Sequence, residues 1–520
     1  MKVEKMVKKG LVVLAAVVLS TSSVYAANVE TMGVGAMNTA QAGAVSAYCD
    51  NVFAAYYNPA GLSLIEKPTM SAGGMYYNAR IKVYDWHVND ANGNKLTGNK
   101  TLEGAPSDYE SDTMHIASPS LGFAMPVAKN LTLGVAAYTP YGLHVTWDKD
   151  PGKSPSSAYA WESYYGRVTM NPTLAYKVSD KLSVGVGVSL GRSISEAGKT
   201  FALPDAAQTT TGINAMVDYK AAADPTLKAK VDGLKAMGVY DDLVKTAKGL
   251  AYSLNGSHLK MDASDDFNYS FNAGIMYRPL KNLSFGLTYR GRTDTKFEGD
   301  VTISNIKGMD DITGTVEMEY DHPEQIQGGV RWFATDKLQI EADVTWTGWS
   351  VNENQDEHAA LHLPASIKGT LGALPAAIQQ ELAKKVTIKD GTLYHTFKHG
   401  RDWEDTTAYK LGVSYQATEA LVLRAGYTYD PSPVPDETFE FGWPDTDRNV
   451  YTLGTGYRFN ERWQLDAVLQ YVISTSKRQT SGGSTELNDN YTTAYGQPAK
   501  VYCKDEGILY GAGVTLTYTF

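Results

Sequence analysis

Long apolar runs are almost absent from this chain of 520 residues. One continuous apolar run lies near the N-terminus, at residues 11–19, and no later run approaches the roughly 20 residues that a membrane-spanning helix requires. The mean hydropathy is correspondingly low, −0.29. These absences exclude a membrane protein built from helices.

Cysteines and clusters of basic residues are also scarce. The two cysteines, Cys49 and Cys503, are too few for a disulfide framework, and the sequence leaves open whether they bond to each other. A net charge of −10 without a basic block argues against nucleic acid as a partner.

Motifs for catalysis or cofactor binding do not stand out either. The histidines His115, His144, His258 and His322 lack the spacing of metal ligands, and no phosphate-binding glycine loop opens a helix. We therefore expect no metal, no cofactor and no enzymatic activity.

The N-terminus has the pattern of an export signal. Residues 1–10 are basic overall, residues 11–19 are apolar, and Val24 and Ala26 form a small-residue cleavage site. The apolar run is too short for a membrane anchor. We expect residues 1–26 to be removed and the mature chain to leave the cytoplasm.

What the chain does contain is a regular alternation of apolar and polar residues. It occurs at residues 182–190, 283–290, 338–346, 421–429, 463–473 and 508–520. A period of two predicts β-strands with one apolar and one polar face. Tyrosine is abundant, with 34 residues against 13 phenylalanines, which suits positions at a membrane–water interface.

Six short polar links join the alternating stretches in pairs. They lie at residues 127–131, 178–182, 278–283, 334–338, 416–421 and 459–463. Six tight turns separated by long segments predict about fourteen antiparallel strands, the pattern of an outer-membrane barrel. A soluble β-sandwich also alternates, but these apolar faces have no second core to cover them. We therefore predict an all-β fold, a transmembrane antiparallel β-barrel, whose sheet closes because lipid cannot satisfy a free edge.

Residues 27–66 do not alternate and are rich in alanine, glycine and asparagine. Such a segment is too short for an independent domain. Because a barrel of about fourteen strands has a wide lumen, we expect these residues to form a plug inside the barrel of residues 67–520. An unstructured periplasmic tail is the alternative.

Several stretches resemble a known family. The run MGVGAMNTAQAGAVSAYCDNVFAAYYNPAGL, which includes Asn58, Pro59, Ala60 and Gly61, is similar to the plug of the FadL/TodX-type outer-membrane transporters of long-chain fatty acids and other hydrophobic compounds. PYGL at 140–143 resembles a third-strand signature of that family, and SPVP at 432–435 and PDTDR at 444–448 resemble its C-terminal third. The terminal Phe520 is similar to the signal that hands such barrels to the barrel assembly machinery.

The resemblance implies a fourteen-stranded barrel closed by an N-terminal hatch, a capture groove built by helical external loops, and exit through a side opening at a kinked third strand. Helical spacing at 202–262 and 352–402 fits such loops, although ordinary extracellular cover is the alternative. Pro140 and Gly142 are the candidates for the opening, because proline lacks a ladder donor and glycine weakens pairing. The alternative is that Pro140 starts a loop. We expect a monomer surrounded by outer-membrane lipid and lipopolysaccharide.

Strand parity directs a set of charged side chains into the barrel, because a charge on the lipid face would cost about 2–4 kcal/mol. The set is Arg80, Arg167, Arg290, Arg331, Lys410 and Arg424, with Glu341, Asp343 and Asp466. The planar guanidinium of an arginine matches a fatty-acid carboxylate, so the ligand-binding candidates are Arg167, Arg290, Arg331 and Arg424. The alternative is that they pair with the interior carboxylates and the plug. Apolar contacts are expected from the plug residues Val45, Val52, Phe53, Tyr56 and Leu62.

The predicted function is passive uptake of hydrophobic molecules across the bacterial outer membrane. Long-chain fatty acids are the first candidate, and alkanes and aromatic compounds are left open. A general porin and a surface adhesin acting through the long loops are the alternatives.

Overall fold

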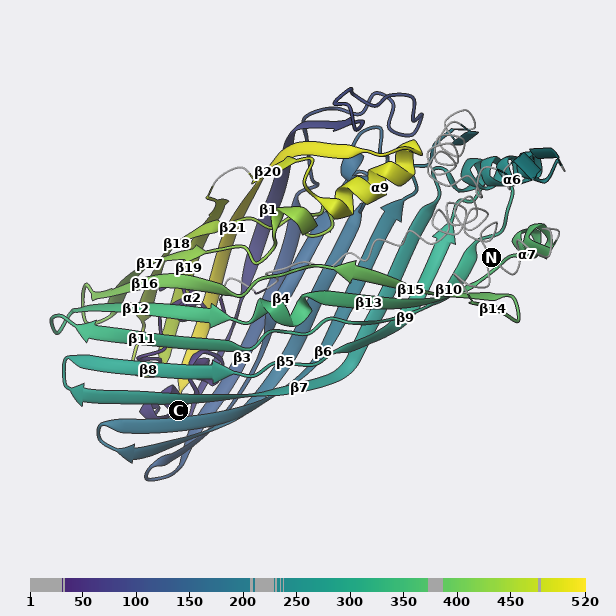
Figure 1. The fold of residues 1–520 in the computed structure, drawn as a ribbon. Helices are drawn as coiled ribbons and strands as arrows, with labels where there is room; N and C mark the ends of the chain where they lie inside the picture. The colour runs from purple at the N-terminus through teal and green to yellow at the C-terminus, as the bar shows by residue number, and fades with distance from the viewer. Residues whose placement is uncertain are drawn as a thin grey trace.

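The computed structural model describes residues 30, 33–205, 209–210, 229, 232–233, 235–236, 238–372, 387–475 and 478–520. The predicted signal peptide lies outside these residues. Within them, the regular structure is mostly antiparallel β-sheet (Figure 1). None of the helices described is both long enough and apolar enough to cross a membrane.

Fourteen strands form a closed ring, in which each strand pairs with the next and the last pairs with the first. In ring order they are β1 (Thr69–Asn89), β3 (Met114–Ala128), β4 (Leu131–Thr146), β5 (Glu162–Ser179), β6 (Leu182–Thr200), β7 (His258–Leu280), β8 (Leu283–Arg290), β11 (Gln325–Phe333), β12 (Leu338–Thr347), β16 (Thr406–Gln416), β17 (Leu421–Asp430), β18 (Arg448–Arg458), β19 (Trp463–Ser474) and β21 (Lys500–Thr519). Thr69 of β1 lies opposite Thr519 of β21 and closes the ring. The predicted barrel is confirmed.

All six predicted short links are turns between neighbouring strands of the ring. They join β3 to β4, β5 to β6, β7 to β8, β11 to β12, β16 to β17, and β18 to β19. The C-terminus lies at the same end of the barrel, where the backbone N–H of Phe520 donates to the carbonyl of Pro68 at 3.0 Å. We assign this end to the periplasm and the long loops to the outside, as is usual for outer-membrane barrels.

The two faces of the barrel wall differ as the alternation predicts. Large apolar side chains such as Tyr269, Leu453 and Leu469 are 66–69% exposed on the outside. Their small or polar neighbours face inward, as Thr515 does at 4% exposure. An apolar outer surface of this extent is stable only when lipid covers it.

A second group of strands extends the sheet beyond the barrel on the long-loop side. The first half of β7 pairs with β9 (Lys296–Ser304), and pairing continues through β10 (Ile312–Glu319), β13 (Asn354–His362) and β15 (Thr392–Gly400) to β14 (Thr387–Lys389). Two short strands, β2 (Tyr109–Glu110) and β20 (Arg478–Ser481), add to β1 and β21.

The helices outside the barrel gather at this end too (Figure 1). They are α6 (Val239–Leu254), α7 (Ala365–Gly372) and α9 (Thr485–Tyr495), with the short 3-10 turns η2 (Pro155–Ala158), η3 (Trp349–Asn352) and η4 (Asp436–Thr438). Helix α6 confirms a helix in the loop at 202–262. The expectation of a helical loop at 352–402 is only partly right, because most of its described residues form β13, β14 and β15. Residues 373–386 of this loop lie outside the described residues.

Aromatic side chains fill the outer end of the lumen. The loop at 431–447 turns inward, so that Phe439, Phe441 and Trp443 are at most 2% exposed. They share one apolar cluster with Trp147 of the β4–β5 loop and Tyr491 of α9. This end of the barrel is therefore packed rather than open.

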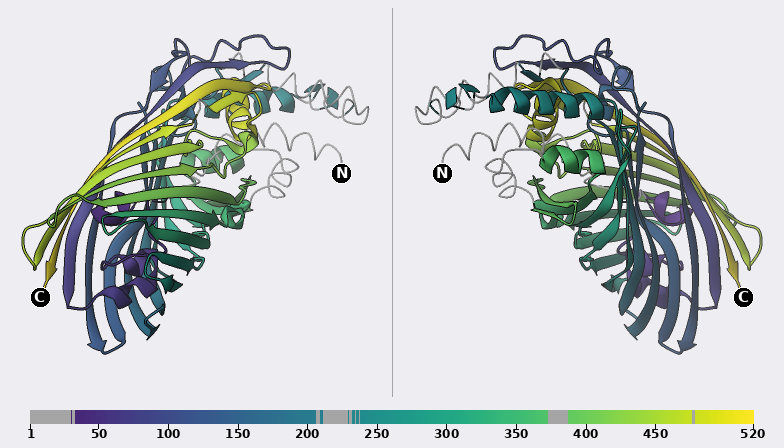
Figure 2. Two further views of the ribbon diagram at one scale, coloured as in Figure 1. Left: turned by 90° about the vertical axis from the view of Figure 1, so that its left-hand side faces the viewer. Right: turned by 90° about the vertical axis from the view of Figure 1, so that its right-hand side faces the viewer.

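Residues 33–66 lie inside the other end of the barrel (Figure 2). We call residues 33–66 the plug. It contains the short helices α2 (Ala36–Thr39) and α3 (Ala54–Tyr57) and the 3-10 turn η1 (Pro59–Leu64). Asn58 begins this turn, because its side-chain oxygen accepts a hydrogen bond from the Ala60 N–H at 3.0 Å.

Candidate functional site

Side chains of the wall hold the plug backbone on several sides. From β5 and β7, Asn171 and Asn272 both donate to the carbonyl of Ala55, at 3.1 and 2.6 Å. Three further hydrogen bonds involve β17, β18 and β21, at 2.9–3.1 Å. Thr428 donates to the carbonyl of Ala42 and Thr452 to that of Ala40, and Thr515 accepts from the N–H of Ala36. The plug is thus bound around most of the ring.

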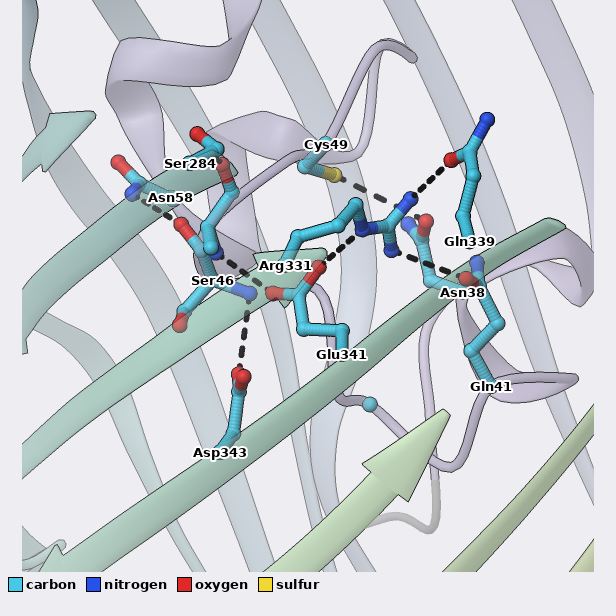
Figure 3. A network of polar contacts seen from close by, with 12 residues as sticks. Asn38, Gln41, Ser46, Cys49, Asn58, Ser284, Arg331, Gln339, Glu341 and Asp343 are labelled. Carbon is cyan, nitrogen blue, oxygen red and sulfur yellow. Dashed lines mark hydrogen bonds and ion pairs between the residues drawn. The ribbon is translucent and has the colours of Figure 1, made fainter. Parts of the chain in front are cut away.

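The strongest of these contacts is a buried network of charged groups on β11 and β12 (Figure 3). Glu341 and Asp343 accept hydrogen bonds from the backbone N–H groups of Ala47 and Ser46, at 2.6 and 3.0 Å. The carbonyl of Ala47 accepts from Ser284 of β8 at 2.6 Å. Bonds to ionised acceptors are roughly twice as strong as neutral ones, so this network fixes the position of residues 46–47.

Two of the four candidate arginines are occupied by this kind of pairing. Arg331 forms an ion pair with Glu341 and donates to Gln41 of the plug at 2.9 Å. Arg424 pairs with Asp466 at 2.7 Å. For both residues the structure therefore favours the alternative of internal pairing.

The other two candidate arginines have no carboxylate within ion-pair distance among the described residues. Arg167 is 3% exposed and donates through Nε to Asn268 at 2.8 Å, and its Nη2 has no hydrogen-bond partner in the described part of the chain. Arg290 binds Gln325 at 2.8 Å and lies over the ring of Tyr56, 4.5 Å from its centre. These two remain the candidates for an anionic ligand.

Arg80 is placed wrongly by the parity argument. Its side chain is 45% exposed, on the same face of β1 as Tyr76, and it binds Glu110 and Thr113 outside the lumen. The ion pair with Glu110 compensates the charge of the guanidinium on the outer face.

The predicted apolar plug residues all lie in one packed cluster. Val45, Val52, Phe53, Tyr56 and Leu62 share it with Ala124, Ala136 and Ala175 of the wall. The plug reaches the wall so closely that a Cβ on Gly122 would meet Val52 at 2.6 Å. These side chains therefore seal the plug against the wall, and only Tyr56 lies beside a candidate arginine.

Strands β3 and β4 are not paired along their whole length. Their ladder runs from Ala128 and Leu131 to Leu121 and Ala137, and no further ladder pair between them occurs in the described structure. The same register returns at one point, where the Asp112 N–H donates to the Thr146 carbonyl at 2.9 Å. Between these points, residues 114–120 of β3 and 138–145 of β4 form no ladder pairs with each other in the described structure, and we call this stretch of the wall the gap.

Both residues predicted to interrupt the third strand lie in the gap. Strand β4 continues to Thr146, so the alternative that Pro140 starts a loop is wrong. The β4–β5 ladder also shifts register between Tyr138 and Tyr141, on either side of Pro140. Tyr141 forms a bridge with Glu30 of the N-terminal segment instead.

A cavity of about 150 Å³ lies behind the gap, and we call it the gap cavity. Most of its lining is apolar and comes from β1, β3, β4, β19 and β21, with polar residues from the segment entering β18. The lining residues are Glu30, Tyr77, Ala79, Arg80, Ile81, Met114, Ile116, Gly142, Leu143, His144, Val145, Pro444, Asp445, Thr446, Arg448, Val472, Ser474, Asp505, Gly507, Ile508 and Leu509.

The charged residues of the gap cavity were not among the predicted site residues. Asp445 and Arg448 belong to PDTDR, and Ser432 of SPVP donates to Asp445 at 2.7 Å. Burial raises the pKa of Asp445 to about 6. SPVP and PDTDR entered the prediction only through their resemblance to the family. Because PDTDR carries both a carboxylate and a guanidinium, it could have indicated a polar site. Asp505 had no signal of its own, because it lies in an ordinary alternating strand.

The disulfide left open by the sequence is not formed. Cys49 lies in the plug, Cys503 lies in β21 opposite Thr480 of β20, and both are buried free thiols.

Comparison with known proteins agrees with this geometry. The sequence profile of the family described as "Outer membrane protein transport protein (OMPP1/FadL/TodX)" matches residues 12–520. Outer membrane protein P1 of Haemophilus influenzae is 24% identical over 507 residues, covering 95% of this chain and 94% of that protein. The long-chain fatty acid transport protein of Escherichia coli O6:H1 is 24% identical over 427 residues, covering 82% of each chain.

Solved structures share the fold at lower sequence identity. A FadL homologue of Pseudomonas aeruginosa superimposes with a TM-score of 0.67 at 16% identity, covering 94% of this chain and 99% of that one. The Pseudomonas putida toluene transporter TodX gives 0.60 at 15% identity with the same coverage. With a profile match over nearly its whole length and a closed fourteen-stranded barrel, this chain belongs to the OMPP1/FadL/TodX family of outer-membrane transport proteins.

Proposed function

We propose that this protein carries hydrophobic molecules passively across the outer membrane and releases them sideways into the lipid through the gap. The observation that carries the proposal is the interrupted β3–β4 ladder with a mostly apolar cavity directly behind it. A barrel wall is normally paired throughout, because lipid cannot satisfy open backbone groups. An interruption is tolerated where the backbone borders a cavity, which makes it a functional feature.

A passage straight through the barrel is disfavoured by the two packed ends. The plug binds wall strands around most of the ring, and the aromatic cluster of the loop at 431–447 fills the outer end. A solute that reaches the gap cavity therefore meets less protein on the way to the lipid than on the way to the periplasm. This arrangement disfavours a general porin.

The class of cargo is supported by the relatives and by the lining. Relatives are named for long-chain fatty acid transport and solved neighbours for toluene transport, so a hydrophobic cargo fits both. For a fatty acid, Arg167 and Arg290 are the groups we propose to receive the carboxylate on its way inward, with Tyr56 beside Arg290. Each guanidinium keeps donor capacity in an interior where a charged hydrogen bond is strong.

The test is transport and conductance measured on the same purified protein in lipid vesicles and planar bilayers. We expect uptake of laurate or toluene above empty vesicles, together with almost no ion conductance. Steady, large conductance without uptake of either compound would support a porin and contradict the proposal. An adhesin would show neither activity, and deletion of residues 354–400 would abolish attachment to host cells.

A further inference from the structure

Four lining residues of the gap cavity, Tyr77, His144, Arg448 and Asp505, each have a buried polar atom without a hydrogen-bond partner among the described residues, and two of these atoms define the proposed site. One is Oδ1 of Asp505, whose residue is 1% exposed, and the other is the hydroxyl of Tyr77, at 3% exposure. Buried acceptors and donors of native proteins are nearly always satisfied. Unsatisfied groups on the wall of one cavity therefore point to a ligand that completes them.

The two atoms mark an elongated site. Asp505 lies opposite Val83 of β1, six residues along the strand from Tyr77, which corresponds to roughly 20 Å at about 3.3 Å per residue. The lining between them is apolar, with Ala79 and Ile81 on β1 and Leu509 on β21. A linear molecule with a polar head at Asp505 fits this shape better than a compact ring does.

The charges of the gap cavity disfavour an anionic head. Glu30, Asp445 and Asp505 are carboxylates in the lining, against the single interior guanidinium of Arg448. Arg448 is already paired with Asp430 at 2.6 Å, and only its Nε has no partner in the described structure. A carboxylate ligand would add a further negative charge beside these acidic side chains in a desolvated site.

The remaining charged neighbours do not change this balance. Arg80 binds Glu110 and Thr113 on the outer face, and Nε2 of His144 lies 3.5 Å from Glu162. Arg478 lies opposite Asp505 in the β20–β21 ladder. Its side chain instead binds Asp436 and the carbonyls of Asp445 and Val434.

Building on the proposed function, we propose that the gap cavity binds linear amphiphiles whose head group donates a hydrogen bond to Asp505 and carries no negative charge, such as a primary alcohol. The hydroxyl hydrogen satisfies Oδ1 of Asp505, and its oxygen can accept from Nε of Arg448. A fatty acid enters the gap cavity only as the neutral acid, which is also the form that partitions into hydrocarbon. Head-group selection at the gap is thus distinct from capture of a carboxylate by Arg167 or Arg290.

The experiment is photolabelling of the full-length protein in lipid nanodiscs. Two twelve-carbon probes carry a diazirine at the same chain carbon and end in an alcohol or in a carboxylate, and labelling is done at pH 8, where the acid is ionised. Labelled peptides are mapped by mass spectrometry. We expect the alcohol to label peptides that contain Met114, Leu143 or Leu509 at least about tenfold more than the acid does, the factor that one hydrogen bond of about 1.4 kcal/mol provides.

Variants assign the selection to one side chain. Asp505→Leu removes the acceptor and should reduce labelling by the alcohol to the level of the acid. Asp505→Asn keeps an acceptor and the shape of the side chain but removes its charge. Labelling by the alcohol should therefore persist and labelling by the acid should increase. This variant also serves if Asp505→Leu fails to fold. Asp436→Asn is the matched control, because that side chain is 68% exposed and does not line the cavity.

The possible results separate this inference from the proposed function. Equal labelling of these peptides by both probes, or unchanged labelling in both Asp505 variants, overturns the head-group selection while leaving transport intact. Absence of any labelling there, combined with absence of laurate and toluene uptake, overturns both.

Discussion

The backbone N–H of Ala47 donates to Oε1 of Glu341 at 2.6 Å, inside a wall where that carboxylate also pairs with Arg331. Glu341→Ala removes both interactions and leaves a buried guanidinium without its charge partner, which typically costs about 3–5 kcal/mol. We expect faster hydrogen exchange of residues 43–48 in this variant than in the wild type.

The double variant Arg331→Met with Glu341→Leu is the control, because it removes both charges together. It should lose less plug stability than Glu341→Ala. If the two variants exchange equally fast, the charge pair does not hold the plug.

Close approach of the plug to β8 gives a second prediction. A Cβ on Gly286 would lie 2.0 Å from the carbonyl oxygen of Ser46, so Gly286→Ala must displace the plug or the strand. Overpacking of this kind costs about 1–3 kcal/mol or more. We expect Gly286→Ala to raise ion conductance in planar bilayers.

Gly328→Ala is the matched variant, on the neighbouring strand β11. Its nearest contact is Leu287 at 3.7 Å, an ordinary distance, so its conductance should equal that of the wild type. If Gly286→Ala leaves the conductance unchanged, the plug does not pack against β8.

The arginines separate into two pairs with different expected effects. Arg167→Gln or Arg290→Gln removes an unpaired cation, and we expect laurate affinity to fall about 10- to 100-fold, the equivalent of one charged hydrogen bond. Arg424→Gln breaks the pair with Asp466 and should leave laurate affinity unchanged. Toluene uptake measured in parallel should be insensitive to all three changes, and equal losses for both ligands would contradict carboxylate binding.

Glu440 makes the aromatic loop sensitive to pH. Burial raises its pKa to about 7 despite the nearby Arg401, whereas the unfolded chain has an ordinary value of about 4.3. At pH values between these two pKa values, the folded loop binds more protons than the unfolded loop. The stability of the loop therefore falls as the pH rises, by on the order of 3 kcal/mol from pH 4.5 to pH 7. Hydrogen exchange of residues 436–443, corrected for intrinsic rates, should show this loss.

Glu440→Gln should flatten that pH dependence, while Asp436→Asn, which changes an exposed carboxyl in the same loop, should preserve it. A loop that becomes more protected as pH rises would reverse the sign and contradict the assignment.

Local patterns in the sequence predicted the barrel because its strands and tight turns are local features. Alternation at residues 182–190 and the turn at 178–182 depend on neighbours in the chain, and together such features determine the number of strands. The extension from β9 to β15 was not predicted, because alternation identifies a strand without identifying its partner. Strands β13, β14 and β15 of the insertion at 352–402 therefore were not recognised as parts of a sheet.

The site was predictable only in part. Pro140 and Gly142 lie in the strand whose pairing with β3 is interrupted, but whether they form an exit stays a prediction, and the point where the β3–β4 ladder ends has no signal in the alternation of β3. Asp445 and Asp505 are sixty residues apart in sequence and line one cavity because β18, β19 and β21 are neighbours in the sheet. Parity placed Arg331 and Arg424 correctly inside, yet could not show which carboxylate each would find.

The most direct test of lateral release is to close the gap with a cleavable cross-link. Ile116 and Gly142 would face each other if the β3–β4 register continued, so Ile116→Cys and Gly142→Cys are combined in a chain whose native cysteines are alanine. The control pair, Leu453→Cys with Leu469→Cys, bridges strands that are already hydrogen-bonded. With a cleavable bis-maleimide, we expect the gap pair to lose most of its laurate and toluene uptake and to recover it after cleavage, while the control pair keeps full uptake. Full uptake through a cross-linked gap would contradict lateral release.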